Sequence, residues 1–127
     1  MRLLLDTNAM LWWVGGNERF ALRAREMIFD PANEVLISAI SYWEAIIKTR
    51  IGKLAFDIDR FEAERILNAF GLLELNNAHL RRLATLPTHH RDPFDHLLIA
   101  QAIEEDAAIV TADGTFAQYP VQVIGCG

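Results

Sequence analysis

The chain opens with Met1-Arg2-Leu3-Leu4-Leu5-Asp6-Thr7-Asn8, and this stretch decides the fold. A short, continuous apolar run that ends in polar turn formers predicts a strand buried on both faces, as in a parallel sheet between helices. Ligands of open α/β sheets bind beyond the carboxyl ends of the strands, so Asp6 lies where chemistry is usually done. For a single acid, however, a helix cap or an Asx turn is the simpler explanation.

Length and composition predict one soluble, globular domain over residues 1–127. The chain is 52% hydrophobic and 23% charged, which excludes disorder, and no apolar run approaches the ~20 residues that cross a bilayer. The apolar run before Asp6 is too short for an export signal, and the lone Cys126 cannot form an intrachain disulfide. We therefore expect a cytoplasmic protein. The net charge of −5 argues against nonspecific nucleic-acid binding through bulk charge.

Further apolar runs alternate with helical patterns along the chain. Short strands are predicted at residues 35–38, 72–75, 107–111 and 121–124. The strand at 35–38 is expected to be parallel to the first strand, which ends at Leu5. Helical spacing is predicted for the segments between them, at residues 9–14, 18–29, 41–51, 63–70, 80–84 and 93–103. This alternation indicates the α/β class, with a central, mainly parallel sheet flanked by helices in three layers.

Three more acids fall at the same expected edge of the sheet. Glu44 lies one turn into the helix after the second strand, although Ser41 and Glu44 also form a capping-box pattern that would serve only the helix start. Asp95 opens the helix before the strand at 107–111, and Asp113 directly follows that strand. A helix-dipole partner and a turn explain these two acids about as well as a function does. One topology nevertheless brings all four acids, Asp6 included, to one crevice.

Carboxylates crowded in this way repel one another, which raises their pKa values unless cations compensate. Oxygen ligands suit Mg²⁺ or Mn²⁺, and no Cys or His spacing predicts a zinc site. We expect the four histidines in loops or on the surface: His79, His89, His90 and His96. Basic residues gather at Lys48, Arg50 and Lys53, which form either a solvated face or a patch for nucleic acid.

Four motifs carry a resemblance that covers nearly the whole chain: Leu4-Leu5-Asp6-Thr7-Asn8, Ser41-Tyr42-Trp43-Glu44-Ala45, Asp92-Pro93-Phe94-Asp95 followed by Leu97-Leu98-Ile99-Ala100-Gln101-Ala102, and Thr111-Ala112-Asp113 followed by Phe116. With these motifs the chain resembles PIN-domain ribonucleases of the VapC toxin type, from bacterial toxin–antitoxin pairs. The resemblance implies a parallel sheet between helices and cleavage of single-stranded or looped RNA. It also implies a Mg²⁺ site, with Mn²⁺ possible, formed by four acids: Asp6, Glu44, Asp95 and Asp113.

The same resemblance implies supporting residues and partners. Asn8 and Thr111 fall at positions that support the first and last acids, whereas His96 and Ala112 stand where many relatives have a basic residue. Toxins of this type are usually held inactive by a small antitoxin, and homodimers or toxin–antitoxin hetero-oligomers are common. Four aromatic residues are candidates for lining an antitoxin groove, although the core is the expected place for each: Trp12, Trp13, Trp43 and Phe61.

Two other functions remain open from the residues alone. An apolar strand that ends in Asp6-Thr7 also suits the nucleophilic carboxylate of an aspartyl-phosphate hydrolase. The motif of that class resembles Asp-x-Asp, whereas here Asn8 stands at the third position. No lysine lies near the carboxyl end of a later strand to hold a phosphate. In the second alternative the acids bind metal only for stability or dock a basic partner, and the domain does not catalyse a reaction.

Overall fold

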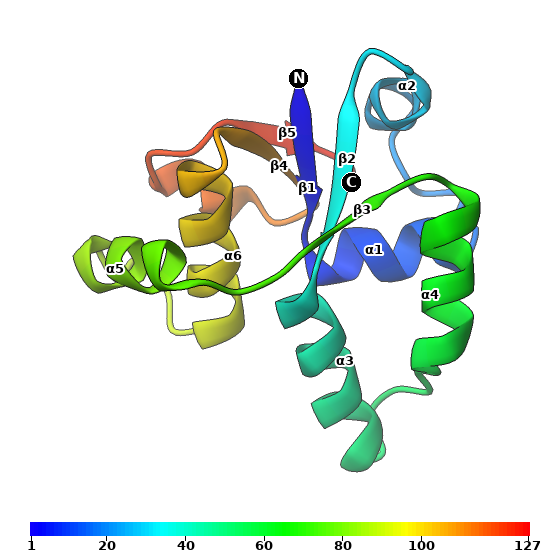
Figure 1. Ribbon diagram of the computed structural model, residues 1–127, viewed down its shortest axis with the longest axis horizontal. Helices are drawn as coiled ribbons and strands as arrows, with labels where there is room; N and C mark the ends of the chain where they lie inside the picture. The colour runs from blue at the N-terminus through cyan, green and yellow to red at the C-terminus, as the bar shows by residue number, and fades with distance from the viewer.

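The computed structural model describes all 127 residues, and at its centre lies a five-stranded parallel sheet with the order β3-β2-β1-β4-β5 (Figure 1). Every neighbouring pair of strands is parallel. The strands are β1 (Arg2–Leu5), β2 (Glu34–Ser38), β3 (Gly71–Leu73), β4 (Ala107–Thr111) and β5 (Val123–Gly125). The predicted α/β class, with its parallel sheet, is confirmed.

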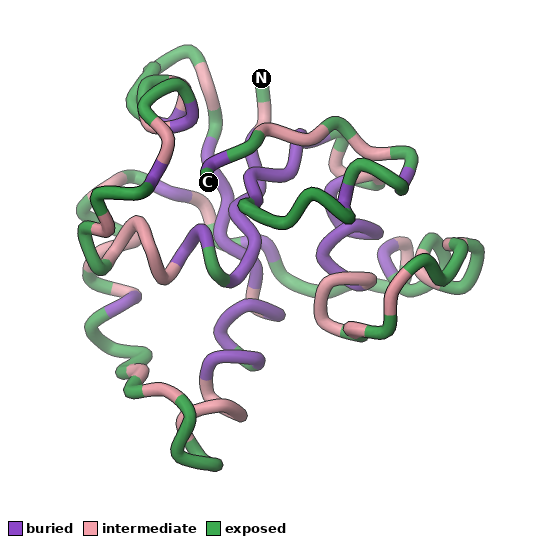
Figure 2. The backbone as a smooth tube through the Cα atoms, turned by 180° about the vertical axis from the view of Figure 1, so that it is seen from behind, coloured by how far each residue is buried: buried purple, intermediate pink, exposed green.

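Helices cover both faces of the sheet. They are α1 (Thr7–Val14), α2 (Leu22–Phe29), α3 (Ala39–Arg50), α4 (Ile58–Leu67), α5 (Asn77–Thr85) and α6 (Pro93–Glu104), followed by the 3-10 helix η1 (Gly114–Gln118). One hydrophobic core lies between the sheet and α1, α2 and α4, and a second lies between the sheet and α6. The strands and α6 are mostly buried, whereas α4 is largely exposed and the outer half of α3 is mostly half-buried (Figure 2). None of these helices combines the length and hydropathy needed to cross a bilayer.

The run Leu3-Leu4-Leu5 explains why the sheet has a helical layer on each side. Leu3 and Leu5 belong to the core under α1 and α2, and Leu4 belongs to the core under α6, because successive strand residues point to opposite faces. All three side chains are inaccessible to solvent. Complete burial on both faces is therefore the physical reason that this strand is apolar without alternation.

The structure corrects several predicted helix starts: the helices expected from residues 63 and 80 begin at Ile58 and Asn77, and two other cases show the reason. The helix expected at Ser41 begins at Ala39, and its cap is Ser38, whose hydroxyl accepts from the Ile40 N–H at 3.0 Å. Ser41 and Glu44 therefore lie inside the helix, and the capping-box interpretation is wrong. The helix expected from residue 18 begins only at Leu22. In both cases several residues could start a helix, and tertiary packing selected one.

Expectations for single side chains also need correction. Trp43 was expected in the core but is 54% exposed. His79 was expected in a loop or on the surface, yet it lies in α5 and is fully buried. Its Nδ1 accepts from the Asn76 N–H at 3.2 Å, and its Nε2 lies 3.0 Å from the Glu105 carboxylate. Burial of this imidazole is tolerated because both ring nitrogens have partners.

Candidate active site

The order of the strands gathers the predicted acids at one edge of the sheet. Asp6 directly follows β1, and its N–H donates to the Val110 carbonyl at 3.0 Å, so the residue stays in register with β4. Asp113 lies two residues beyond the end of β4. Glu44 enters from α3, which begins without a loop at the end of β2, and Asp95 enters from the first turn of α6. Because β1 lies between β2 and β4, these positions are neighbours.

Asp6 is a buried carboxylate whose two oxygens both have donors. Oδ1 accepts from the Ala9 N–H at 2.8 Å, which makes Asp6 the cap of α1, and Oδ2 accepts from the Thr111 hydroxyl at 2.6 Å. The side chain is only 4% exposed. Burial raises the pKa of Asp6 to about 6, with smaller contributions from the charges of Glu44 and Asp113, and the two hydrogen bonds oppose this rise. Capping and membership of the acidic group thus coincide in one residue.

Glu44 is equally buried and is held by two side chains. Oε1 accepts from the Thr7 hydroxyl at 2.6 Å, and Oε2 pairs with the Lys48 ammonium at 2.6 Å, one turn along α3. The Thr7 hydroxyl, whose proton goes to Glu44, can also accept from the Ser41 hydroxyl at 3.1 Å, so α1 and α3 are joined beneath the carboxylate. The bond to Glu44 is the main reason that the pKa of Lys48 is raised, and the charges of Asp92 and Asp95 add to it. Lys48 therefore lies within the field of the acids.

Asp95 is the least compensated acid of the group. Its side chain accepts no hydrogen bond, although its backbone N–H is capped by Asp92 at 3.2 Å. Burial raises the pKa of Asp95 to about 8, and the negative charges of Asp92, Asp6, Glu44 and Asp113 contribute in that order. An acid that responds to four other carboxylates must lie within their electrostatic reach. The expected mutual repulsion is thus present in the structure.

Asp113 lies on the exposed side of the group. Its Oδ1 accepts from the Thr115 N–H at 2.9 Å and from the Thr115 hydroxyl at 2.7 Å, so it caps η1. Its own N–H donates to the Thr111 hydroxyl at 3.0 Å, while that hydroxyl donates to Asp6. Thr111 therefore connects the first and last acids with a single oxygen.

A family comparison agrees with this arrangement, since the family model for the PIN domain matches residues 3–122. The chain belongs to the PIN-domain family. Ribonuclease VapC22 of Mycobacterium tuberculosis is 25% identical over 122 residues, which cover 87% of this chain and 86% of that protein.

Solved structures show the same fold. VapBC2 from Rickettsia felis, bound to a DNA fragment from its promoter, superimposes with a TM-score of 0.77 at 17% identity, over the full length of both chains. DNA-bound VapBC from Salmonella typhimurium gives a TM-score of 0.72 at 15% identity, over 98% of each chain. The three-layer PIN-like fold inferred from the sequence is therefore confirmed.

The donor set of this PIN domain fits a hard divalent cation. All four acids offer oxygen, and burial together with the neighbouring carboxylates raises the pKa values of Asp6 and Asp95, so a cation would stabilise their ionised forms. No three Asp, Glu, His or Cys side chains form a ready-made cluster around one point, however. Existing hydrogen bonds explain this, because Asp6 and Glu44 already use both of their oxygens within the chain. A metal ion must therefore compete with Lys48 for Glu44.

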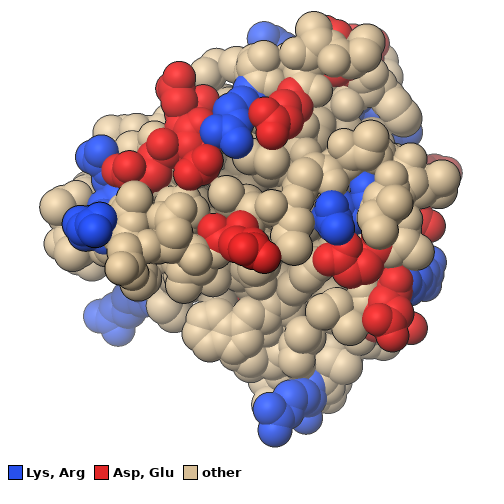
Figure 3. Space-filling model, in the orientation of Figure 1, with Lys and Arg blue, Asp and Glu red and all other residues tan.

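The other residues predicted for the PIN site are placed unevenly. Thr111 contacts the acids directly, whereas the Asn8 side chain is exposed and makes no hydrogen bond within the chain. Lys48 pairs with Glu44, while Arg50 and Lys53 are exposed at the far end of α3 and are paired with no acid. Of the three basic residues, only Lys48 is thus tied to the acids. On the face drawn in Figure 3, Lys and Arg side chains lie singly or in small groups among acidic ones, without a continuous basic track.

Three contributors to the site were not assigned a role from the sequence. Thr7 and Ser41 join α1 to α3 beneath Glu44, and among the neighbouring charges Asp92 raises the pKa of Asp95 most. Asp92 was recognisable only as the cap of α6, a role it does fill. The sequence points to Thr7 only through its position directly after Asp6. Its partner Glu44 lies 37 residues away, and the fold alone brings the two together.

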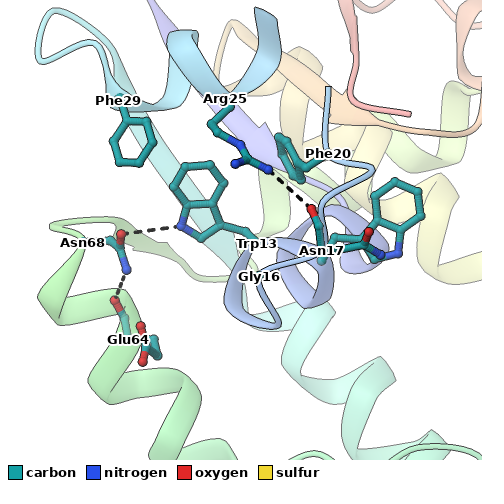
Figure 4. A pocket seen from close by; sticks show the side chains of 9 residues that line it. Trp13, Gly16, Asn17, Phe20, Arg25, Phe29, Glu64 and Asn68 are labelled. Carbon is teal, nitrogen blue, oxygen red and sulfur yellow. Dashed lines mark hydrogen bonds between the residues drawn. The ribbon is translucent and has the colours of Figure 1, made fainter. Parts of the chain in front are cut away.

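A separate cavity of about 290 Å³ lies away from the acids, between α1, α2 and α4 (Figure 4). Trp12 and Trp13 line it and are half-buried, so they belong partly to the core and partly to this surface. The Trp13 indole packs edge-on or tilted against Phe20 and Phe29, at 5.4 and 5.1 Å between ring centres. Phe61, in contrast, is buried in the core as predicted.

Proposed function

We propose that this PIN domain is a metal-dependent endoribonuclease, the toxin component of a toxin–antitoxin pair, which cleaves single-stranded or looped RNA. One observation carries the proposal: four acids from four separate elements share one edge of the sheet, and only Lys48 compensates them. Such uncompensated charge is costly in a fold without a cation to bind. Membership of the PIN family and the similarity to a VapC ribonuclease support the same chemistry.

In this proposal Asp6, Glu44, Asp95 and Asp113 hold Mg²⁺ or Mn²⁺. When bound, the ion supplies a Lewis acid that activates water and neutralises charge on the phosphate. The Asp95 side chain accepts no hydrogen bond from within the chain, so of the four carboxylates it is the one free to orient the attacking water and take its proton. Thr111 and Thr7 orient Asp6 and Glu44. Lys48, released from Glu44, is available to contact an RNA phosphate.

The aspartyl-phosphate alternative fits the geometry less well. A nucleophilic carboxylate needs an oxygen that can reach the phosphorus atom. Both oxygens of Asp6 accept hydrogen bonds within the chain, and the residue is 4% exposed. Its surroundings suit a buried ligand or an orienting group better than an attacking one.

The test is cleavage of a mixed, structured RNA pool by purified protein without antitoxin. We expect cutting with Mg²⁺ or Mn²⁺, no cutting with chelator, and no cutting by a folded Asp6→Asn variant. Asp30→Asn is the matched control, because Asp30 also caps local backbone but precedes β2, at the opposite edge of the sheet. Retained activity in folded Asp6→Asn would refute the assignment of the site. If the protein binds metal but cleaves no RNA in vitro, and sequencing of RNA ends after expression in cells shows no new cuts, the non-catalytic module is favoured.

We also propose a small antitoxin as the partner of this chain. The solved relatives named above are VapBC complexes, and this chain has exposed apolar side chains on two helices beside the cavity in Figure 4. Leu22 and Phe29 on α2 are 69% and 67% exposed, and Leu67 on α4 is 80% exposed. Phe29 lines the cavity, and exposed apolar residues on the helices that border a cavity indicate a surface that a protein partner covers.

Co-expression with a candidate antitoxin encoded beside this chain tests that partner. We expect a stable complex without ribonuclease activity, and weaker binding by Phe29→Ser than by the control Ile58→Ser, an exposed apolar residue at the start of α4. Light scattering of the complex and of the free chain then reports whether homodimers or hetero-oligomers form. Equal binding of the antitoxin by both variants would show that the cavity is not part of the interface.

A further inference from the structure

An aromatic pair with one exposed ring lies on the two helices that carry Glu44 and Asp95. Trp43 on α3 directly precedes Glu44, and Phe94 on α6 directly precedes Asp95. Their rings meet edge to face, with 5.1 Å between centres and 74° between planes. Trp43 is 54% exposed, and among the large exposed hydrophobic residues only Trp43 and Phe29 are aromatic. Phe29 lies at the other cavity, so Trp43 is the exposed aromatic ring next to the acids.

The pair is well suited to hold a flat ligand. Phe94 is half-buried against the core under α6, so it braces the Trp43 indole while much of the indole stays in solvent. Packing of α3 against α6 fixes the two helices that carry the rings. A braced indole loses little side-chain entropy when a ligand stacks on it, which favours binding.

We propose that Trp43 stacks an unpaired nucleobase of the RNA, next to the phosphate that lies over the acids. This inference rests on the proposed function. Charge alone does not hold RNA here, because the acids repel phosphate and Lys48 is paired with Glu44. Stacking on an aromatic face requires no charge and accepts any base, provided that the base is unpaired. The substrate class is therefore RNA with an unpaired nucleotide beside the cleaved bond.

The experiment measures binding of a short, labelled single-stranded RNA by fluorescence anisotropy, with Mg²⁺ present and Asp6→Asn as the non-cleaving background. We expect Trp43→Ala to weaken binding about 10-fold, equivalent to about 1.4 kcal/mol, at the low end for base–aromatic stacking. Trp43→Phe retains a ring and should stay within about 3-fold of the parent. Phe29→Ala is the matched control, because it removes an exposed ring away from the acids, and it should leave binding unchanged.

A second arm uses an RNA of the same length with abasic sites. If Trp43 stacks a base, Trp43→Ala and its parent bind this RNA equally. Equal affinity of Trp43→Ala and its parent for the normal RNA would overturn the inference, as would a loss that persists with abasic RNA. Loss of antitoxin binding alone, with RNA binding unchanged, would instead make Trp43 part of the protein interface. Cleavage by the unsubstituted chain is scored separately, so failure of the nuclease proposal is distinguishable from failure of the stacking site.

Discussion

Substitution of Asp6 by Asn should make the metal-free protein more stable at neutral pH. The amide has nearly the shape of the carboxylate and can keep both contacts, since its oxygen can accept from the Ala9 N–H and its nitrogen can donate to the Thr111 hydroxyl. What the change removes is a negative charge in a site that is 4% exposed. The effect on the free energy of unfolding therefore follows from the titration of this carboxyl group.

The magnitude follows from the two pKa values. Asp6 has a pKa of about 6 in the folded chain, against 3.8 for the ordinary carboxyl group. At about 1.36 kcal/mol per pH unit, this difference costs the folded state about 3 kcal/mol once both states are ionised. Below pH 4 both states are protonated and the cost is absent; it grows as pH rises and is complete above about pH 6. The stability of Asp6→Asn relative to the natural chain should therefore rise by about 3 kcal/mol between pH 4 and pH 7.

Urea denaturation of both proteins with chelator, at pH steps from 4 to 8, measures this difference. At pH 7 it corresponds to a melting temperature roughly 10 °C higher for the variant. Addition of Mg²⁺ should stabilise the natural chain more than the variant, because a ligand shifts the transition according to its affinity for the folded state and the variant has lost one carboxylate. A stability difference that stays constant from pH 4 to pH 7 would refute the assignment of uncompensated charge to Asp6.

Three further predictions concern the neighbouring charges. Burial and four carboxylates raise the pKa of Asp95 to about 8, so Mg²⁺ should bind more weakly at pH 6 than at pH 8.5. Near neutral pH the binding of Mg²⁺ should release protons, and calorimetry in buffers of different ionisation heat measures this release. Lys48→Met should strengthen Mg²⁺ binding, since it removes the cation that competes for Glu44. In urea denaturation without metal it should lower the free energy of unfolding by more than ~1 kcal/mol, since it leaves the Glu44 side chain, which is only 5% exposed, without its cation. His79→Leu should lower the free energy of unfolding by ~2 kcal/mol or more, because it strips the buried partner from the Asn76 N–H and the Glu105 carboxylate; a loss below ~0.5 kcal/mol would contradict this.

The first strand shows how much of the fold follows from local sequence. An unbroken run of Leu3, Leu4 and Leu5 is stable only where both faces are covered, and this fixes a parallel sheet with helices on each side. The acids at the strand ends then follow from topology, since parallel strands bring their carboxyl ends to one edge. Asp6 and Asp113 were therefore placed correctly from the sequence.

Features that depend on contacts between distant segments were not predictable in this way. Ser38 and Ser41 are both good helix caps, and only the direct entry of β2 into α3 decides for Ser38. Trp43 has the large apolar side chain of a typical core residue, and its exposure follows from the position of α3 beside α6. His79 has no local signal of burial, because its partner Glu105 lies 26 residues along the chain.

Helix capping and function are not alternatives at this site. Asp6 and Asp113 cap α1 and η1, and the same hydrogen bonds fix the direction in which each carboxylate points. Asp95 differs, since nothing in the chain donates to its side chain, and its pKa is accordingly the higher of the two values raised in the acidic group. Rigid acids with internal donors thus frame one acid without any, so a cation that enters gains most from Asp95. For that reason Asp95, rather than the better-ordered Asp6, should set the pH dependence of metal binding.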